Sequence, residues 1–401
     1  MKKCFLSIAI ILFFSSLAIS QAQLRVMVIF AHPDEGEIYT GGITALYTRM
    51  GQQVKFMSLT NGDAGHYSMK PADLAKMRYQ EAMESKKILS LGDYEVLDYH
   101  DQYLKNNKET QDKVIKSIQE WNPDIVFTYY PAKGGHIDNM TAGYIVRDAA
   151  PRLQMAKIPV FVYIRDFFTI TLSYVPDFAV DIESVWATKL AACSAMRSQV
   201  MDAIPHSMGI LDEVRADPAK QKELIYQNTY PFSSVTNINM PALEKWYGQE
   251  DASKIKFAEA FEIAEFGHQP VEAEMLRLFP MLPRSSLVPA TKDWTETGIE
   301  VKQGDMLDIS ATGKILWKLQ GSMGCGPDGV SPFMEEPGKP IPGANTGSLI
   351  ARIGPDGQSI FVGSRKKIIA PKAGKIYLGV NDGNLKDNDG EFRVWIKKNQ
   401  D

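Results

Sequence analysis

The stretch 24–37, which reads LRVMVIFAHPDEGE, constrains the fold more than any other part of the chain. Its apolar and largely β-branched run at 26–30 predicts a short buried strand. The strand stops at polar residues, and from Gly36 onward the spacing of apolar residues predicts a helix. A strand followed by a helix is the first half of a βαβ unit, and ligands of open α/β sheets bind at the carboxyl ends of the strands. We therefore expect a functional site directly after residue 30.

Three polar side chains occupy that position, His32, Asp34 and Glu35. Histidine and carboxylates bind metals and transfer protons, so the cluster predicts a metal site or an acid–base site. A structural interpretation is also open, because Asp and Glu in the first turn of a helix interact favourably with the helix macrodipole. That interpretation accounts for the carboxylates and leaves the histidine unexplained.

Predicted strands and helices alternate as far as residue 150, which indicates a Rossmann-like, doubly wound and mostly parallel sheet. Polar loops that contain histidine follow two of these strands, at 61–66 and at 132–139. Both loops should open on the same edge of the sheet as His32. The further strands are expected at 54–60, 94–99 and 124–130, and the helices at 71–91, 110–121 and 140–150.

The character of the sequence changes at 280–296, a segment with Pro and Ser and no periodicity, where we place a domain boundary. Before it, 187–201 and 254–267 are predicted to be helical. After it, short apolar segments alternate with turns, and 391–397 alternates apolar and polar residues with a period of two. This pattern predicts an all-β sandwich. The expected organisation is a signal peptide at 1–22, an α/β domain at 23–285 and a β-sandwich domain at 286–401.

The N-terminus carries Lys2 and Lys3 before an apolar run at 4–19, and small residues follow. This order is typical of a secretory signal peptide, so we expect a secreted or periplasmic protein with no integral membrane segment after cleavage. The mature chain would keep Cys193 and Cys325, which lie in different predicted domains, so a disulfide within one domain is excluded. A formal net charge of -4 gives no support to nucleic-acid binding.

Residues 24–270 resemble the PIG-L/LmbE-like family of zinc-dependent N-acetyl-sugar deacetylases. The motif AHPDEGE at 31–37 is similar to the family's Ala-His-Pro-Asp-Asp-Glu, and GGHIDNMTAG at 134–143 is similar to its His-x-Asp-His. Arg78 and Glu81 also match a recurrent Arg-x-x-Glu feature of the family.

The resemblance implies a role for each matching residue. His32, Glu35 and Asn139 would occupy the three metal positions. Asp34 would be the general base for the metal-bound water, and His136 would polarise the amide or stabilise the oxyanion. These residue types suit the chemistry, because an amide is a poor electrophile that needs an activated water and a neutralised oxyanion. Two further residues would contact the substrate, Arg78 and Asp101.

Two positions depart from the family's pattern. Glu35 stands where the family has Asp, and zinc accepts either carboxylate. Asn139 stands where the family has His, and a neutral amide oxygen suits harder cations better than zinc. Asp138 or His66 could take the place of that third ligand.

These observations predict a hydrolase that depends on Zn2+ or another divalent metal and removes N-acetyl groups from amino-sugar-containing glycans. Two alternatives stay open. One is a catalytically degenerate, glycan-binding relative without a functional metal site. The other is a hydrolase of the same fold that acts on another amide or on an ester.

Residues 292–398 resemble the PA-IL type of calcium-dependent galactose-binding lectin. The matching segments are GPDG at 326–329, IARIG at 350–354 and YLGVNDGNLKDNDGEFRV at 377–394. This region contains no histidine, so the sugar-contacting histidine of that family has no counterpart here.

The lectin resemblance implies a Ca2+ site at Asp382, Asp387 and Asn388, where the ion would also bind sugar hydroxyls. Calcium takes six to eight oxygen ligands, and the loop is rich in carboxylates, amides and backbone carbonyls. The domain would then target the enzyme to its glycan. The structural alternative is a long β-hairpin whose Asp, Asn and Gly residues only satisfy the turn geometry.

Overall fold

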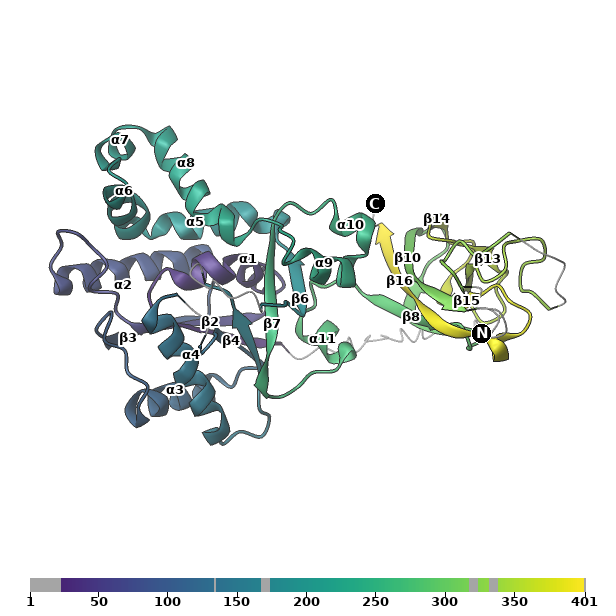
Figure 1. The fold of residues 1–401 in the computed structure, drawn as a ribbon, viewed down its shortest axis with the longest axis horizontal. Coiled ribbons are helices and arrows are strands. Elements are labelled where there is room, and N and C mark those ends of the chain that lie inside the picture. Colours follow the sequence, from purple (N-terminus) through teal and green to yellow (C-terminus); the bar gives the residue numbers. More distant parts are fainter. Residues whose placement is uncertain (1–22, 133–134, 167–173, 317–323, 332–337, 400–401) are drawn as a thin grey trace, which may run out of the picture.

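The computed structural model describes residues 23–132, 135–166, 174–316, 324–331 and 338–399. The predicted signal peptide at 1–22 and Gly134 of the second motif lie outside these ranges. The described residues form two separate hydrophobic cores, one in the N-terminal α/β part and one in the C-terminal β part. Figure 1 shows the two parts side by side along the longest axis of the molecule.

A seven-stranded sheet forms the centre of the N-terminal part, with the strand order β3-β2-β1-β4-β5-β7-β6. The first five of these strands are parallel to one another, and β7 runs antiparallel to β5 and to β6. The prediction of a Rossmann-like, mostly parallel sheet is therefore confirmed. The strands are β1 (Arg25–Phe30), β2 (Gln53–Thr60), β3 (Asp93–Tyr99), β4 (Ile125–Tyr129), β5 (Val160–Ile164), β6 (Phe178–Asp181) and β7 (Ala258–Gly267).

Helices cover both faces of this sheet (Figure 1). On one face α1 and α2 pack against α5, and on the other face α3 packs against α4. A shorter helical segment, α6 to α8, continues from α5, while α9 and α10 lie next to the C-terminal part. The helices are α1 (Glu35–Arg49), α2 (Pro71–Ile88), α3 (Lys108–Trp121), α4 (Ile137–Ala149), α5 (Trp186–Ala195), α6 (Ile204–Ser207), α7 (Leu211–Ala216), α8 (Pro218–Thr229), α9 (Met240–Tyr247), α10 (Gln249–Ala252) and α11 (Glu272–Leu278).

The predicted helix at 254–267 is wrong, because most of this segment forms strand β7. Its Ala and Glu residues have high helix propensity, which favours a helix when the segment is considered alone. In the structure, β7 lies between β5 and β6, and it buries Phe261 and Ala264 in the core. Pairing with two strands that are distant in sequence overrides the local preference.

The C-terminal part consists of two antiparallel sheets, as the period-two pattern predicted. One sheet has the order β11-β10-β16-β8, with β14 also paired to β10, and the other has the order β13-β12-β15-β9. The strands are β8 (Ser285–Pro289), β9 (Thr295–Val301), β10 (Met306–Leu316), β11 (Gly324–Cys325), β12 (Leu349–Ile353), β13 (Ile360–Phe361), β14 (Arg365–Ile369), β15 (Gly374–Val380) and β16 (Asp389–Asn399).

The final strand, β16, connects the two parts of the protein. The indole nitrogen of Trp395 donates to the backbone oxygen of Trp246 in α9, and the Trp395 side chain is only 2% exposed. On the same strand, Arg393 donates to both carboxylate oxygens of Glu272 in α11, at 2.8 and 3.1 Å. The β domain is therefore held against the α/β domain by a buried aromatic contact and by ion pairs, among them Arg393–Glu272 and Lys397–Asp251.

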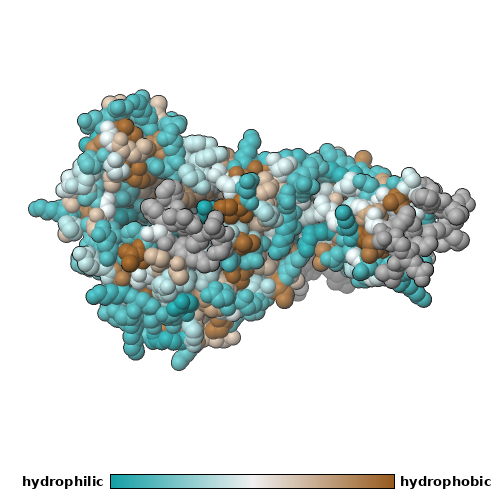
Figure 2. Space-filling view, in the orientation of Figure 1, coloured by the Kyte–Doolittle hydropathy of each residue, from teal (hydrophilic) through white to brown (hydrophobic). Residues whose placement is uncertain are grey.

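The face of the molecule in Figure 2 is largely hydrophilic, with apolar side chains in small groups. Within the part of the chain that the structure describes, no helix has both the length and the apolar character to cross a membrane.

Candidate active site

The predicted polar loops meet at the carboxyl edge of the parallel strands. His32 follows β1, Asp101 follows β3 and His136 follows β4. They line a pocket of about 270 Å³ beside the start of α1. All residues of the α/β domain to which the sequence assigned a role line this pocket, namely His32, Asp34, Glu35, Arg78, Asp101, His136 and Asn139.

His32 is buried among carboxylates. Its Nδ1 lies 3.0 Å from Glu35 Oε1, and its Nε2 lies 2.9 Å from Asp101 Oδ1 and 3.4 Å from Asp138 Oδ2. Burial opposes protonation of the imidazole, but the three carboxylates raise the pKa of His32 well above its usual value. Surroundings that stabilise positive charge on a buried ring also favour a bound cation.

His32, His136 and Asp138 form a group that fits a divalent metal. Each offers one ligand atom, and these atoms all lie within 4.8 Å of one another. The two imidazole rings meet edge to face, with centroids 4.8 Å apart. Two histidines and a carboxylate are a common ligand set for catalytic zinc, which leaves a further position for water.

Glu35 lies next to this group, but both of its oxygens already accept hydrogen bonds. Oε2 accepts from the backbone N–H of Ala31 and of His32, each at 2.9 Å, and Oε1 faces Nδ1 of His32. A carboxylate on the second ring nitrogen of a ligating histidine orients the ring and makes it a better ligand. In this arrangement Glu35 has the position of an orienting group for His32.

Asp34 has an unusual backbone, with φ at 130°, a value that residues other than glycine rarely adopt. Its Oδ2 lies 3.0 Å from Nη2 of Arg78. Burial raises the pKa of Asp34 to about 7, although Arg78 acts in the opposite direction. A carboxyl group with a pKa near neutrality is suited both to accept and to donate a proton, and local backbone strain is characteristic of functional sites.

Arg78 holds Asp34 in this position. The buried guanidinium also donates to the backbone oxygens of Gly62, at 3.1 Å, and of Pro33. Gly62 has a φ of 66°, and a Cβ at this position would lie 2.4 Å from Arg78 Nη1. Glu81, the other residue of the Arg-x-x-Glu feature, accepts hydrogen bonds from the backbone and hydroxyl of Ser198 and so supports the segment after α5.

Asn139 lies in the first turn of α4. Its Nδ2 donates to Asp166 Oδ2 at 3.1 Å, while its Oδ1 is buried and has no hydrogen-bond partner among the described residues. The helix approaches β4 closely here, because a Cβ at Gly143 would lie 2.4 Å from the backbone oxygen of Tyr129. The glycine of the second motif thus lets α4 present Asn139 to the pocket.

His66, the other alternative ligand, is not part of the metal group. Its Nδ1 accepts from the backbone of Ser68 and Met69, and its ring stacks on Tyr67. Of the two alternatives for the third ligand, Asp138 lies near His32, with its Oδ2 3.4 Å from Nε2. His66 instead binds backbone groups of its own loop.

Three residues of the site were missed by sequence reasoning. Asp63 accepts from the backbone N–H of Asp101 at 3.0 Å, and the backbone N–H of Gln102 donates to Asp138 Oδ2 at 2.6 Å. Asp166 comes two residues after β5, so the rule that ligands gather at strand ends would have found it if that strand had been predicted.

The predicted calcium residues lie in the loop between β15 and β16. Asp382 Oδ1 accepts from the backbone of Asn384 at 3.0 Å. Three other oxygens of the loop are buried and have no hydrogen-bond partner among the described residues, namely Asp382 Oδ2, Asp387 Oδ1 and Asn388 Oδ1.

The fold and the pocket define a two-domain protein. Its α/β domain has a His- and Asp-containing site that can bind a divalent metal, and its second domain is antiparallel β. Comparison with known proteins assigns it further. The chain belongs to the PIG-L family, whose model, described as GlcNAc-PI de-N-acetylase, matches residues 27–150. A second model, described as PA-IL-like protein, matches residues 285–401. Both resemblances seen in the sequence are therefore confirmed, and the chain is a deacetylase of the PIG-L family with a lectin-like domain.

Two curated relatives agree with this assignment, and one solved structure is similar to the chain. The probable N-acetyl-alpha-D-glucosaminyl L-malate deacetylase 2 of Bacillus cereus is 31% identical over 186 residues, which cover 44% of this chain and 84% of that protein. The diacetylchitobiose deacetylase of Thermococcus kodakarensis is 27% identical over 186 residues, covering 44% of this chain and 70% of that protein. A solved structure of N,N'-diacetylchitobiose deacetylase from Pyrococcus horikoshii is 21% identical, covers 60% of this chain and 83% of that chain, and has a TM-score of 0.44.

Proposed function

We propose that the protein is an exported, zinc-type hydrolase that removes N-acetyl groups from amino-sugar-containing glycans. The observation that carries the proposal is the convergence of His32, His136 and Asp138 beside a carboxyl group, Asp34, whose pKa is near neutrality. The relatives named above act, by their names, on N-acetylated amino sugars, which supports this substrate class.

The proposed metal site uses the ring nitrogens of His32 and His136 and the carboxylate of Asp138. The buried Oδ1 of Asn139, which lacks a partner among the described residues, is available as a weaker fourth ligand. Glu35, which the resemblance places at a ligand position, would orient His32 through Nδ1. A bound zinc ion would supply a more acidic water and would polarise the amide carbonyl.

The remaining steps belong to residues of the chain. Asp34 removes the proton from the attacking water and delivers it to the leaving amine, since its carboxyl group lines the same pocket as His32 and His136 and can both accept and donate a proton. Arg78 keeps the carboxyl group of Asp34 directed into the pocket. Asp101 lies 2.9 Å from His32 and lines the same pocket, where it can accept hydrogen bonds from sugar hydroxyls.

Metal analysis combined with an activity assay tests the proposal. The purified protein should contain about one zinc ion and release acetate from diacetylchitobiose, and removal of the metal by a chelator should abolish the release until zinc is restored. His136→Ala separates two roles of that residue. Loss of zinc indicates a ligand, whereas retained zinc with lost turnover indicates the oxyanion role that the resemblance implies. Turnover that survives complete removal of metal would contradict the proposal, and a protein that binds glycan without metal would favour the degenerate alternative.

We propose in addition that the β domain binds Ca2+ through Asp382, Asp387 and Asn388 and brings the enzyme to its glycan. Three buried oxygens of these residues have no hydrogen-bond partner within the part of the chain that the structure describes, which supports a cation site, because leaving buried acceptors unpaired costs free energy. Export is proposed from the sequence of residues 1–22 alone.

A further inference from the structure

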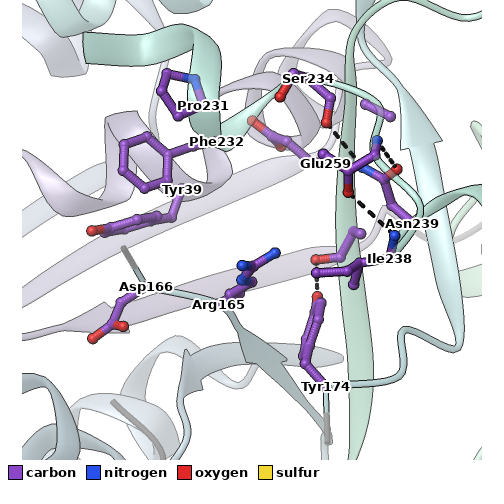
Figure 3. A pocket seen from close by; sticks show the side chains of 13 residues that line it. Tyr39, Arg165, Asp166, Tyr174, Pro231, Phe232, Ser234, Ile238, Asn239 and Glu259 are labelled. Carbon is purple, nitrogen blue, oxygen red and sulfur yellow. Dashed lines mark hydrogen bonds between the residues drawn. The ribbon is translucent and has the colours of Figure 1, made fainter. Parts of the chain in front are cut away.

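A second pocket lies next to the candidate active site. It has a volume of about 200 Å³ and is enclosed by α1, the ends of β5 and β7, and the segment that precedes α9. Figure 3 shows the Arg165 side chain pointing into it, with Tyr39 and Phe232 on one side and Tyr174 on another.

Two contacts connect this pocket to the active site. Tyr39 lines both pockets, so its ring forms part of the boundary between them. Asp166, which lines the second pocket, accepts the hydrogen bond from Asn139, which lines the first. A ligand that extends from the metal site past Tyr39 would therefore enter the second pocket.

Arg165 is the cation of this pocket that remains available to a ligand. Among the described residues no carboxylate forms an ion pair with it, and its Cζ lies 5.8 Å from the centre of the Tyr174 ring. Glu259, which also lines the pocket, already binds Lys189 Nζ at 2.7 Å and accepts from the backbone N–H groups of Gly42 and Ile43, each at 2.8 Å. Two carboxylates line the pocket: Glu259 is neutralised from within the fold by Lys189, and Asp166 accepts hydrogen bonds from the Asn139 amide and the Gly135 backbone. The guanidinium of Arg165 faces the same pocket.

The remaining lining suits a sugar ring. Tyr39 and Phe232 meet edge to face, with ring centroids 4.9 Å apart, and Tyr174 is fixed by a hydrogen bond from its hydroxyl to the backbone of Ala260. Rigid aromatic rings contribute apolar contact area at a low cost in conformational entropy. Ser234 adds a hydroxyl at the rim. A volume of about 200 Å³ equals that of roughly seven water molecules in the liquid, which is room for one small ring and not for a chain of rings.

We propose that this pocket is a second subsite that binds a sugar residue carrying a carboxylate, of the uronic acid type, next to the N-acetylated sugar. The planar guanidinium of Arg165 binds the carboxylate through two parallel hydrogen bonds, a geometry that arginine provides and lysine does not. The inference rests on the proposed function in one respect, since the acidic sugar and the N-acetylated sugar belong to the same substrate.

The test compares two disaccharides that differ only at C6 of the second sugar, where one has a carboxylate and the other a hydroxymethyl group. They are N-acetylglucosamine linked to glucuronic acid and N-acetylglucosamine linked to glucose. The wild-type protein should show a KM for the acidic disaccharide that is about tenfold or more below that for the neutral one, the preference expected from a charge-assisted hydrogen bond. Arg165→Gln should remove this preference by raising KM for the acidic disaccharide alone. Arg284→Gln, which changes an exposed arginine outside both pockets, should leave the preference intact.

Direct binding separates failure of the subsite from failure of the proposed function. Calorimetry measures the affinity of the protein for glucuronic acid and for glucose, and it does not require turnover. Binding of glucuronic acid that depends on Arg165, in a protein that releases no acetate from any substrate, would sustain the subsite and contradict the deacetylase proposal. Equal KM values for the two disaccharides, or an equal loss for both in Arg165→Gln, would overturn the subsite whatever the activity.

Discussion

The side-chain amide of Asn139 donates a hydrogen bond of 3.1 Å to Asp166 Oδ2, so that its oxygen is turned away from Asp166 and remains without a partner among the described residues. The resemblance to the family's His-x-Asp-His motif implies a histidine at this position, and here an aspartate from the neighbouring strand end fixes the orientation of the amide. The pair thus determines which atom of Asn139 is available to a metal.

The first prediction follows from this pair. Asn139→His should tighten zinc binding, because imidazole is a better zinc ligand than an amide oxygen and Asp166 can accept a hydrogen bond from the second ring nitrogen. A competition titration with a zinc chelator measures the change, which we expect to be about tenfold or more. An unchanged zinc affinity would mean that residue 139 does not face the metal.

The second prediction separates metal binding from proton transfer. His32→Ala should lower the zinc content of the purified protein, because it removes the central ligand. Asp34→Asn should keep the zinc and reduce kcat by about 10²- to 10⁴-fold, since the amide cannot accept the proton. Metal content and acetate release from the same preparations provide the measurement. Full activity of Asp34→Asn would rule out Asp34 as the base.

The third prediction concerns the β domain. Added Ca2+ should raise the melting temperature of the protein, because an ion that binds only the folded state stabilises it by mass action. Asp382→Ala should abolish both this response and the binding to immobilised glycan, while hydrolysis of a small soluble substrate stays unchanged. Asp356→Ala, an exposed aspartate elsewhere in the domain, is the matched control. A wild-type protein that melts at the same temperature with and without Ca2+ would favour the turn interpretation of the loop.

The fourth prediction concerns pH and the contact between the two domains. Arg393 lowers the pKa of Glu272 below its ordinary value of 4.5. Burial raises the pKa of Asp251, but Lys397, 2.6 Å away across the same contact, outweighs this and lowers it below 3.8. Groups with a lowered pKa stabilise the docked state above their ordinary pKa values, and this stabilisation is lost as the pH falls through the lowered values.

Acidification from pH 5 to pH 3 should therefore loosen the docking, seen as an increase in the radius of gyration by small-angle scattering. The double variant Glu272→Gln/Asp251→Asn should already be looser at pH 7 and change less with pH. Glu296→Gln removes an ion pair with Lys375 inside the β domain and should behave like the wild type. An identical pH response in the double variant would show that these pairs do not hold the domains together.

Local patterns were sufficient for the outline of the protein. The apolar run before His32 predicted β1, the alternation of strands and helices predicted the parallel sheet, and the period of two near the C-terminus predicted the β domain. These signals are local, since the spacing of apolar residues within one strand or helix predicts which of its faces is buried. Every residue of the α/β domain to which the sequence assigned a role lines the active-site pocket, whereas other lining residues such as Gln102 were not predicted.

Long-range contacts decided the rest. Residues 258–267 became a strand because β5 and β6 provide partners on both sides, which their own composition does not reveal. The oxygens of Glu35 are occupied by His32 and two backbone amides. Asp138, and not His66, joins the metal group, because α4 begins after β4 and lies beside His32. Arg165 faces a second pocket in which Glu259 is already paired with Lys189, a residue distant in sequence from both. Three-dimensional contacts determine which oxygen and nitrogen atoms already form hydrogen bonds or ion pairs. The atoms without such partners are the ones that can bind a metal or a ligand.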